Sequence, residues 1–245
     1  MSGEFHKFPH TPHLVWLGEG HPREDKLLSR EEAGEFLAGE VIVEEKVDGA
    51  NLGISLAPDG RVRAQSRGNY LAPGRSHAQW NPLWPWLAEH RAGLEEVLQG
   101  GLMLFGEWCY AKHTVPYDAL PDWFLGFDIF EVASRRFWPA DRRNEWLRKR
   151  GLVSIPEVTR GRMSMKRLLS LLGKSAVGHT PMEGIYLRRD QDGWLQARAK
   201  VVSVAFQQQI EEHWTRRPVT ANDLALIHIG GGHRPPLQTS SDNEI

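Results

Sequence analysis

The stretch Val41-Ile42-Val43-Glu44-Glu45-Lys46-Val47-Asp48-Gly49-Ala50-Asn51 places a lysine at the end of an expected strand and directly before an expected turn. Residues 41–47 are rich in β-branched side chains, which favour extended backbone. Asp48-Gly49 has the composition of a tight turn, and residues 51–56 predict a second strand after it. A turn in this place would expose the amine of Lys46. A lysine before a turn is nevertheless more often structural than catalytic, so this stretch alone does not establish a chemistry.

Outward from this stretch, strands and helices alternate along the chain. Pro58-Asp59-Gly60 predicts a hairpin turn, and residues 61–67 predict the strand that follows it. Apolar and aromatic runs predict further strands at residues 102–108, 123–132, 184–189 and 194–202. Helices are predicted at residues 81–98, 141–150, 165–172 and 204–214, the third of them capped by Ser164. Mainly antiparallel strands with helices between them predict an α+β fold.

The composition is that of an ordinary globular protein. A chain of 245 residues with 40% hydrophobic content can bury one substantial core in one or two domains. No apolar run approaches the roughly 20 residues that span a bilayer, and the N-terminus lacks the apolar stretch of a signal peptide. Cys109 is the only cysteine, which excludes an internal disulfide and a cysteine-based zinc site. We therefore predict a cytoplasmic protein without a membrane partner.

The net charge of -1 hides an uneven distribution along the chain. Residues 1–132 carry a formal charge of -9, whereas residues 133–217 carry +10. An excess of arginine and lysine in one region is typical of a face that binds phosphate groups. An ordinary solvated basic surface is an equally good interpretation of the charge alone.

Six segments then resemble, in order, the motifs of the covalent nucleotidyltransferases, the superfamily of DNA ligases, RNA ligases and mRNA capping enzymes. They are Lys46-Val47-Asp48-Gly49, Ser66-Arg67-Gly68, Leu104-Phe105-Gly106-Glu107-Trp108, Phe124-Leu125-Gly126-Phe127-Asp128-Ile129-Phe130, Glu183-Gly184-Ile185-Tyr186-Leu187-Arg188 and Arg198-Ala199-Lys200-Val201-Val202. Several are weak individually, but their agreement in number and order makes chance improbable. The longer run from Glu45 to Asn51, which closes with an asparagine, is similar to the RNA ligase 2-like branch. The residues around Phe8 to Leu14 also resemble an upstream element of such ligases, which would line the adenine pocket.

The resemblance implies that Lys46 is the catalytic nucleophile and becomes joined to AMP. The implied AMP- and ATP-binding set is Glu45, Lys46, Val47, Asn51, Arg67, Glu107, Phe127, Glu183, Arg198 and Lys200. In the family, the arginine and the first glutamate contact the ribose, an aromatic side chain stacks on the purine, and the basic pair holds the α-phosphate. Phe124 and Phe130 remain alternatives to Phe127 for the stacking role. The implied cofactors are ATP as AMP donor and Mg²⁺ or Mn²⁺, with Glu183 as the candidate metal ligand.

These roles are chemically consistent with one another. A lysine amine is a nucleophile only when it is neutral, and nearby cations lower its pKa. We therefore expect Arg198, Lys200 and the metal to lower the pKa of Lys46. The same groups would stabilise the negative charge that develops on the phosphate. Arginine cannot lose a proton, so Arg198, where the RNA ligase 2 type has lysine, implies a purely electrostatic role.

The resemblance also implies the domain organisation and the reaction. We expect a nucleotidyltransferase (ATP-grasp-like ligase) domain of mainly antiparallel sheets over residues 1–215, followed by a short, partly disordered extension over residues 216–245. Only 45 residues follow Lys200, too few for the OB-fold that DNA ligases and capping enzymes carry there. The expected function is an ATP-dependent RNA ligase of the kind used in RNA repair, which joins 5′-phosphate and 3′-hydroxyl ends. A DNA ligase-like sealer and an inactive nucleic-acid-binding relative are the alternatives.

Overall fold

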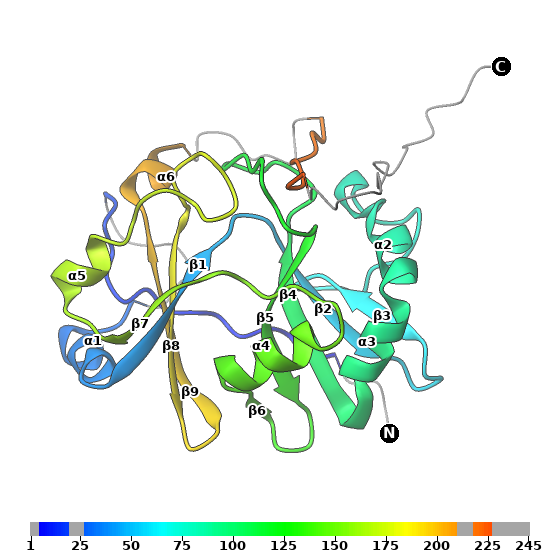
Figure 1. Cartoon of the computed structure of the whole chain (residues 1–245), viewed down its shortest axis with the longest axis horizontal. Coiled ribbons are helices and arrows are strands. Elements are labelled where there is room, and N and C mark those ends of the chain that lie inside the picture. Colours follow the sequence, from blue (N-terminus) through cyan, green and yellow to red (C-terminus); the bar gives the residue numbers. More distant parts are fainter. Residues whose placement is uncertain (1–4, 20–26, 210–217, 227–245) are drawn as a thin grey trace.

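Two antiparallel sheets lie side by side in the computed structural model, which describes residues 5–19, 27–209 and 218–226 (Figure 1). The first sheet has the strand order β7-β1-β8-β9, with β1 (Glu40–Lys46), β7 (Glu157–Arg162), β8 (Gly184–Gln191) and β9 (Trp194–Val202). The second sheet has the order β3-β2-β4-β5-β6, with β2 (Ala50–Leu56), β3 (Val62–Gln65), β4 (Leu102–Trp108), β5 (Phe124–Glu131) and β6 (Arg136–Phe137). Neighbouring strands are antiparallel throughout.

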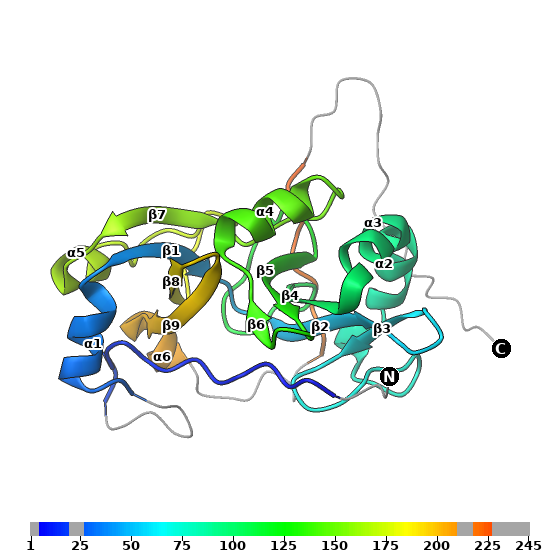
Figure 2. The same cartoon turned by 90° about the horizontal axis from the view of Figure 1, so that it is seen from below.

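Helices cover both sheets and thereby create two separate cores. The helices α1 (Arg30–Leu37) and α5 (Met165–Leu169) lie beside the first sheet, and α6 (Val204–Gln209) follows β9 (Figure 1). The helices α2 (Leu83–Glu89), α3 (Arg91–Val97) and α4 (Ala140–Arg148) lie over the second sheet, as the view from below shows (Figure 2). Short 3-10 turns at Ala78–Trp80 and Gln99–Gly101 flank α2 and α3.

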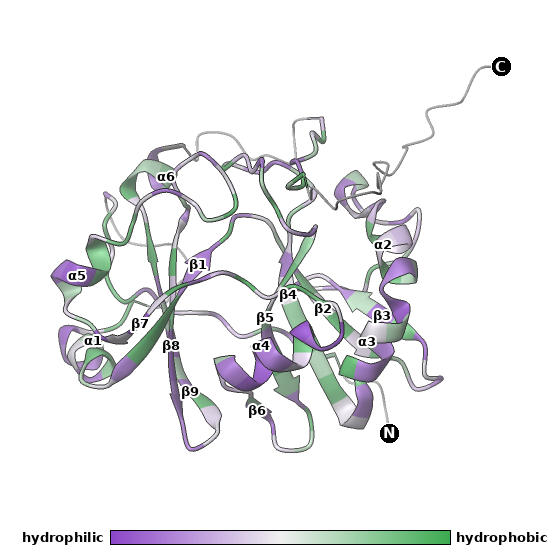
Figure 3. Ribbon diagram, in the orientation of Figure 1, coloured by the Kyte–Doolittle hydropathy of each residue, from purple (hydrophilic) through white to green (hydrophobic). Residues whose placement is uncertain are grey.

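Each core is built from apolar residues of the strands and helices, and apolar stretches are visible along the strands of both sheets (Figure 3). Phe36 of α1 and Leu168 of α5 are buried with Val43 of β1, while Leu94 of α3 is buried against Leu52 of β2. Burial of a side chain of this size contributes about 1.5–3 kcal/mol. The two cores therefore hold the two sheets as firm supports for the segments that connect them.

A third cluster fills the junction between the sheets. Val47, Tyr117 and Phe206 are buried there together, although they come from the turn after β1, the loop after β4 and α6. The junction is therefore packed around the turn that carries Lys46.

The observed elements confirm the predicted strands and the α+β class. Ser164 caps α5 as expected, since its side chain accepts a hydrogen bond from the Arg167 amide. The helix predicted at residues 81–98 is wrong as a single element, because the chain bends at His90 (φ −92°, ψ 8°) between α2 and α3. The His90 ring stacks on Trp86, and its Nδ1 lies 2.9 Å from the Trp86 carbonyl oxygen.

The predicted C-terminal extension is described only in part. Residues 218–226 lie against the main body, with bridges between Ala111 and Ala221 and between Leu120 and Leu224. The predicted domain boundary at residue 215, the end of the helix predicted to reach residue 214, and the tail from residue 227 onward lie outside the described residues. In the part of the chain that is described, no helix is both long and apolar enough to cross a membrane.

Candidate active site

A cavity of about 780 Å³ opens between the two sheets and is lined by residues of both. Nine of the ten residues of the predicted binding set line it: Glu45, Lys46, Val47, Asn51, Arg67, Glu107, Phe127, Glu183 and Lys200. Phe8, Thr11 and His13 of the N-terminal segment line it as well. Motifs that are more than 100 residues apart in the chain therefore meet at one place.

Lys46 is in this cavity because the chain changes sheets there. Lys46 is the last residue of β1 and pairs with Gly184 of β8, whereas Ala50 begins β2 and pairs with Trp108 in the second sheet. The crossing requires glycine at position 49, since a Cβ there would lie 2.7 Å from the Trp108 carbonyl oxygen. The turn thus brings its lysine between the two sheets.

The amine of Lys46 is paired with a carboxylate. Its Nζ lies 2.7 Å from Oε1 and 2.8 Å from Oε2 of Glu183. Burial lowers the pKa of Lys46, but the negative charges of Glu183 and Glu107 outweigh burial and raise it. The protein's own side chains thus raise the pKa of Lys46, contrary to what we expected from Arg198 and Lys200, because acidic groups outnumber the cations beside the amine.

The excess of acidic over basic groups also affects Glu107 and Glu183. Burial raises the pKa of Glu107 to about 8 and that of Glu183 to about 7, although the charge of Lys46 opposes both shifts. Arg67 also opposes the rise in the pKa of Glu107, and Lys200 opposes the rise in that of Glu183, but neither cancels the effect of burial. Carboxyl groups perturbed in this way beside a cavity are typical of functional sites.

The second sheet supplies the wall opposite Glu183. Asn51 and Glu107 are cross-strand neighbours on β2 and β4, and Arg67 lies in the segment after β3. Phe127 of β5 lines the cavity, and its ring lies 5.1 Å from that of Phe8. Phe124 and Phe130 do not line it.

Arg198 is the one predicted binding residue that does not line the cavity. Its Nη1 lies 3.0 Å from Oδ2 of Asp128, and its guanidinium lies over the rings of Phe8 and Phe137 at 4.9 and 4.1 Å. Asp128 is fully buried, so its charge attracts this guanidinium away from the cavity.

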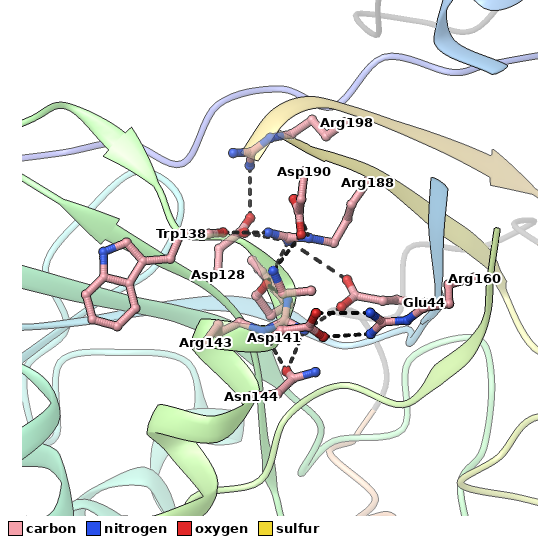
Figure 4. Close-up of polar contacts among 12 residues, drawn as sticks. Glu44, Asp128, Trp138, Asp141, Arg143, Asn144, Arg160, Arg188, Asp190 and Arg198 are labelled. Carbon is pink, nitrogen blue, oxygen red and sulfur yellow. Dashed lines mark hydrogen bonds and ion pairs between the residues drawn. The ribbon is translucent and has the colours of Figure 1, made fainter. Parts of the chain in front are cut away.

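Arg198 belongs instead to a buried ionic cluster that joins the two sheets (Figure 4). Arg188 of β8 contacts Asp128 of β5 at 2.6 Å and donates to the Phe127 carbonyl at 3.1 Å. Arg143 of α4 donates to Glu44 of β1 and to the same Phe127 carbonyl. The cluster thereby holds the backbone of Phe127 behind the cavity wall.

Glu45, the residue directly before Lys46, binds the loop that contains Ser175 and Ala176. Its Oε1 accepts from the Ser175 hydroxyl at 2.5 Å, and its Oε2 accepts from the Ala176 amide at 2.7 Å. Burial raises the pKa of Glu45, while both hydrogen bonds lower it. Val47, its neighbour beyond Lys46, is buried in the junction.

A sequence model of the family described as RNA ligase matches residues 39–202, more than half of the chain. The chain belongs to the RNA ligase family. This confirms the family expected from the motifs. A comparison with curated proteins gave no significant match.

Solved RNA ligase structures share the fold of this family member. An alanine variant of Naegleria gruberi RNA ligase with ATP and Mn matches with a TM-score of 0.59 and 16% identity, over 84% of this chain and 62% of that chain. The same ligase with pyrophosphate matches with a TM-score of 0.56 and 16% identity, over 83% and 64%. The present chain thus spans less than two thirds of the length of these ligases.

Two contributors to the site have no motif that could have indicated them. Tyr117 is buried, and its hydroxyl accepts a hydrogen bond from the Asp48 amide, whereas Asn222, 105 residues further along the chain, is buried against Tyr117. Tyr117 lies in the irregular loop after β4, and Asn222 lies in the segment 218–226. Only the fold brings these two residues together.

Proposed function

We propose that this protein is an ATP-dependent RNA ligase that acts through a lysyl-AMP intermediate. The observation that carries the proposal is the position of the Lys46 amine, in a cavity between two sheets and within hydrogen-bonding distance of Glu183. Membership of the RNA ligase family supports it, as does a fold shared with a ligase solved with ATP and Mn.

In the first step, the Lys46 amine would attack the α-phosphorus of ATP, form a nitrogen–phosphorus bond and release pyrophosphate. The amine must first lose a proton. Glu183 is the acceptor within reach, since it hydrogen-bonds the amine at 2.8 Å and has a pKa of about 7. Transfer of this proton would leave a neutral amine beside a neutral carboxyl. Lys200, on the same cavity, would stabilise the charge that develops on the phosphate.

The rest of the nucleotide would lie along the wall of the second sheet. Arg67 and Glu107 carry groups that hydrogen-bond ribose hydroxyls, and Phe127 offers a ring face for the adenine. Asn51, Glu45 and Val47 would complete the wall around the lysine. For Arg198 we propose an indirect role, because its guanidinium is bound to Asp128 behind that wall.

The residues present fit a metal that is held largely by the nucleotide. The described residues contain no group of three or more histidine, cysteine, aspartate or glutamate side chains that could hold a metal alone. Mg²⁺ often binds through one or two carboxylates together with substrate phosphates. Glu183, in its ionised form, would supply one such carboxylate. When bound, Mg²⁺ or Mn²⁺ would neutralise negative charge on the phosphates.

In the later steps, AMP would pass from Lys46 to the 5′-phosphate of an RNA strand. A 3′-hydroxyl would then attack this activated phosphate, seal the strand and release AMP. The partner is therefore a nucleic acid with both ends, and the basic region from residue 133 to 217 would attract its backbone.

Labelling with ATP tests the first step. The protein is mixed with Mg²⁺ and with ATP that carries radioactive α-phosphate, and the label that stays on the protein after denaturation in detergent is measured. Wild type is expected to take label, and Lys46→Ala is expected to take none. Lys149→Ala is the matched control, because Lys149 is an exposed lysine at the C-cap of α4 and pairs with Glu145. Equal labelling of wild type and Lys46→Ala would refute the covalent role.

A substrate panel tests the later steps. Labelled GTP and NAD⁺ are compared with ATP, and sealing is measured on nicked RNA, RNA–DNA hybrid and DNA duplexes. We expect ATP to be preferred and RNA to be sealed. Sealing of DNA alone would indicate a DNA ligase-like enzyme, and binding of RNA without label would indicate an inactive relative.

A further inference from the structure

The turn after Lys46 is held by the loop that connects β4 and β5. The Asp48 carboxylate does not line the cavity. Its Oδ2 instead accepts hydrogen bonds from the amides of Thr114 and Val115, at 2.7 and 2.9 Å. The Asp48 amide in turn donates to the Tyr117 hydroxyl at 2.7 Å. Three hydrogen bonds therefore set the position of the backbone two residues beyond the nucleophile.

This loop, residues 109–120, has no helix or strand of its own. Residues 220–225 run along it and form backbone hydrogen bonds with it. These bonds join Lys112 to Thr220 (2.8 Å), Tyr110 to Asn222 (2.8 Å), Tyr117 to Asp223 (3.0 Å), Leu120 to Asp223 (3.2 Å) and Leu120 to Ala225 (2.8 Å). An irregular loop is ordered only where its backbone groups find such partners. The segment 220–225 thus supplies one set of contacts that hold the loop, beside its hydrogen bonds to Asp48 and the burial of Val115, Tyr117 and Leu120.

One side chain of this segment ties the two ends of the loop together. Asn222 is 1% exposed, and its Oδ1 accepts from the Tyr117 amide at 2.8 Å. Its Nδ2 donates to the carbonyls of Cys109 at 2.8 Å and Ala111 at 3.3 Å. An asparagine amide supplies one acceptor and two donors at once, which these three contacts use.

We propose that Asn222 is a positioning residue for Lys46, acting through the loop that it closes, through Tyr117 and through Asp48. The inference rests on the proposed function, in which Lys46 attacks the nucleotide. Attack requires the amine to be held close to one geometry, and a displacement of about 1 Å can reduce a rate by about 100-fold. Loss of the Asn222 contacts would let residues 109–120 move. The turn at Asp48, which is hydrogen-bonded to this loop, would then move as well.

Kinetics of lysyl-AMP formation test the proposal in the full chain. Single-turnover labelling is followed over a range of ATP concentrations for wild type, Asn222→Ala and Asn222→Asp. The aspartate keeps the acceptor for Tyr117 but presents an oxygen to the two carbonyls. We expect the maximal rate to fall about 100-fold in both variants, with less than about a threefold change in half-saturating ATP, since neither variant alters a nucleotide contact.

Two further variants separate positioning from simple loss of stability. Ser29→Ala removes the N-cap of α1, far from the loop, and is expected to lower the melting temperature without slowing the labelling. Tyr117→Phe removes only the hydroxyl, which accepts a hydrogen bond from the Asp48 amide. If Asn222 acts through Tyr117, the double variant Asn222→Ala/Tyr117→Phe will be no slower than the slower single variant. Fully multiplicative effects would overturn this route.

Hydrogen exchange supplies a readout that does not depend on activity. Asn222→Ala is expected to speed exchange of the amides in residues 46–49 and 112–118, whereas Ser29→Ala leaves them unchanged. Labelling rates of Asn222→Ala within twofold of wild type would overturn the inference and leave the proposed function intact. If wild type takes no label, the proposed function fails, and unchanged exchange in Asn222→Ala would then overturn the positioning role as well.

Discussion

Two clusters of charged side chains lie next to each other in this protein, and they differ in their numbers of acidic and basic groups. The cluster behind Phe127 contains three acids and three arginines: Glu44, Asp128, Asp190, Arg143, Arg188 and Arg198. The cluster at the cavity contains four acids and three bases: Glu45, Asp48, Glu107, Glu183, Lys46, Arg67 and Lys200. We call the first the closed cluster, because among its six residues only Glu44 lines the cavity, whereas six of the seven residues of the second line it.

The difference shows what each cluster can do. In the closed cluster, Arg188 is fully buried. Burial lowers its pKa, but the negative charges of Asp128 and Glu44 raise it by more than burial lowers it. Charges held in this way join the two sheets. At the cavity, Glu107 and Glu183 have pKa values near 8 and 7 because cations there do not offset their burial. Carboxyl groups with pKa values near neutral pH are suited to accepting and returning protons.

The largest effect is expected from Lys46→Arg, which keeps the charge at the cavity and removes the nucleophile. Arginine can still pair with Glu183, but it cannot lose its proton. Labelling by ATP should fall at least about 10⁴-fold, with the melting temperature close to that of wild type. Labelling above a hundredth of the wild-type level would contradict Lys46 as the nucleophile.

Arg188→Met tests the closed cluster. The change leaves Asp128 and Glu44 buried with fewer positive partners, and removal of one member of a buried ion pair costs about 3–5 kcal/mol. Urea unfolding followed by circular dichroism would measure the loss. Arg160→Met is a control, because Arg160 makes its ion pairs with Asp141 and Glu157 at the surface and should cost about 1 kcal/mol or less. Equal losses in the two variants would show that the buried cluster is not special.

Glu107→Gln tests the imbalance at the cavity through its pH dependence. The folded wild type keeps the Glu107 proton up to a pKa of about 8, whereas the ordinary value is 4.5. Stability that depends on this proton is present below pH 4.5 and is lost as the pH rises toward 8. Glutamine does not titrate, so the variant should gain up to roughly 2–4 kcal/mol over wild type between pH 5 and 8.5. Urea unfolding at several pH values would measure this gain, and a difference that stays constant with pH would refute the raised pKa.

The smallest effect is expected from Arg198→Lys. Lysine keeps the charge beside Asp128 but loses the planar contacts with Phe8 and Phe137, worth about 1 kcal/mol. Labelling should fall less than about tenfold because this side chain does not line the cavity. Lys200→Ala, which removes a cavity-lining cation, should reduce labelling by about 100-fold or more. A reversed order would place Arg198 at the phosphate after all.

Most strands and helices could be predicted from the sequence because they depend on local patterns. The β-branched run before Lys46, the Asp59-Gly60 turn and the apolar run of β4 each predict an element, and each element is present. The sequence patterns did not predict α1, β6 or β7. The helix α1 has only eight residues, although Ser29 and Glu32 form a capping box at its start, and β6 has only two residues. The strand β7 is polar and partly exposed and shows no apolar alternation.

The amino-acid sequence was enough to predict the strand that ends at Lys46 and to find its companion motifs in the order of the RNA ligase family. It could do so because strand propensity, turn chemistry and motif order are properties of short segments. The tertiary structure alone decided three matters: the raised pKa of Lys46, the direction of Arg198 and the arrival of Asn222 at the loop beside Asp48. Each depends on charges or hydrogen bonds between residues far apart in the chain, and no local pattern encodes which of them will be neighbours.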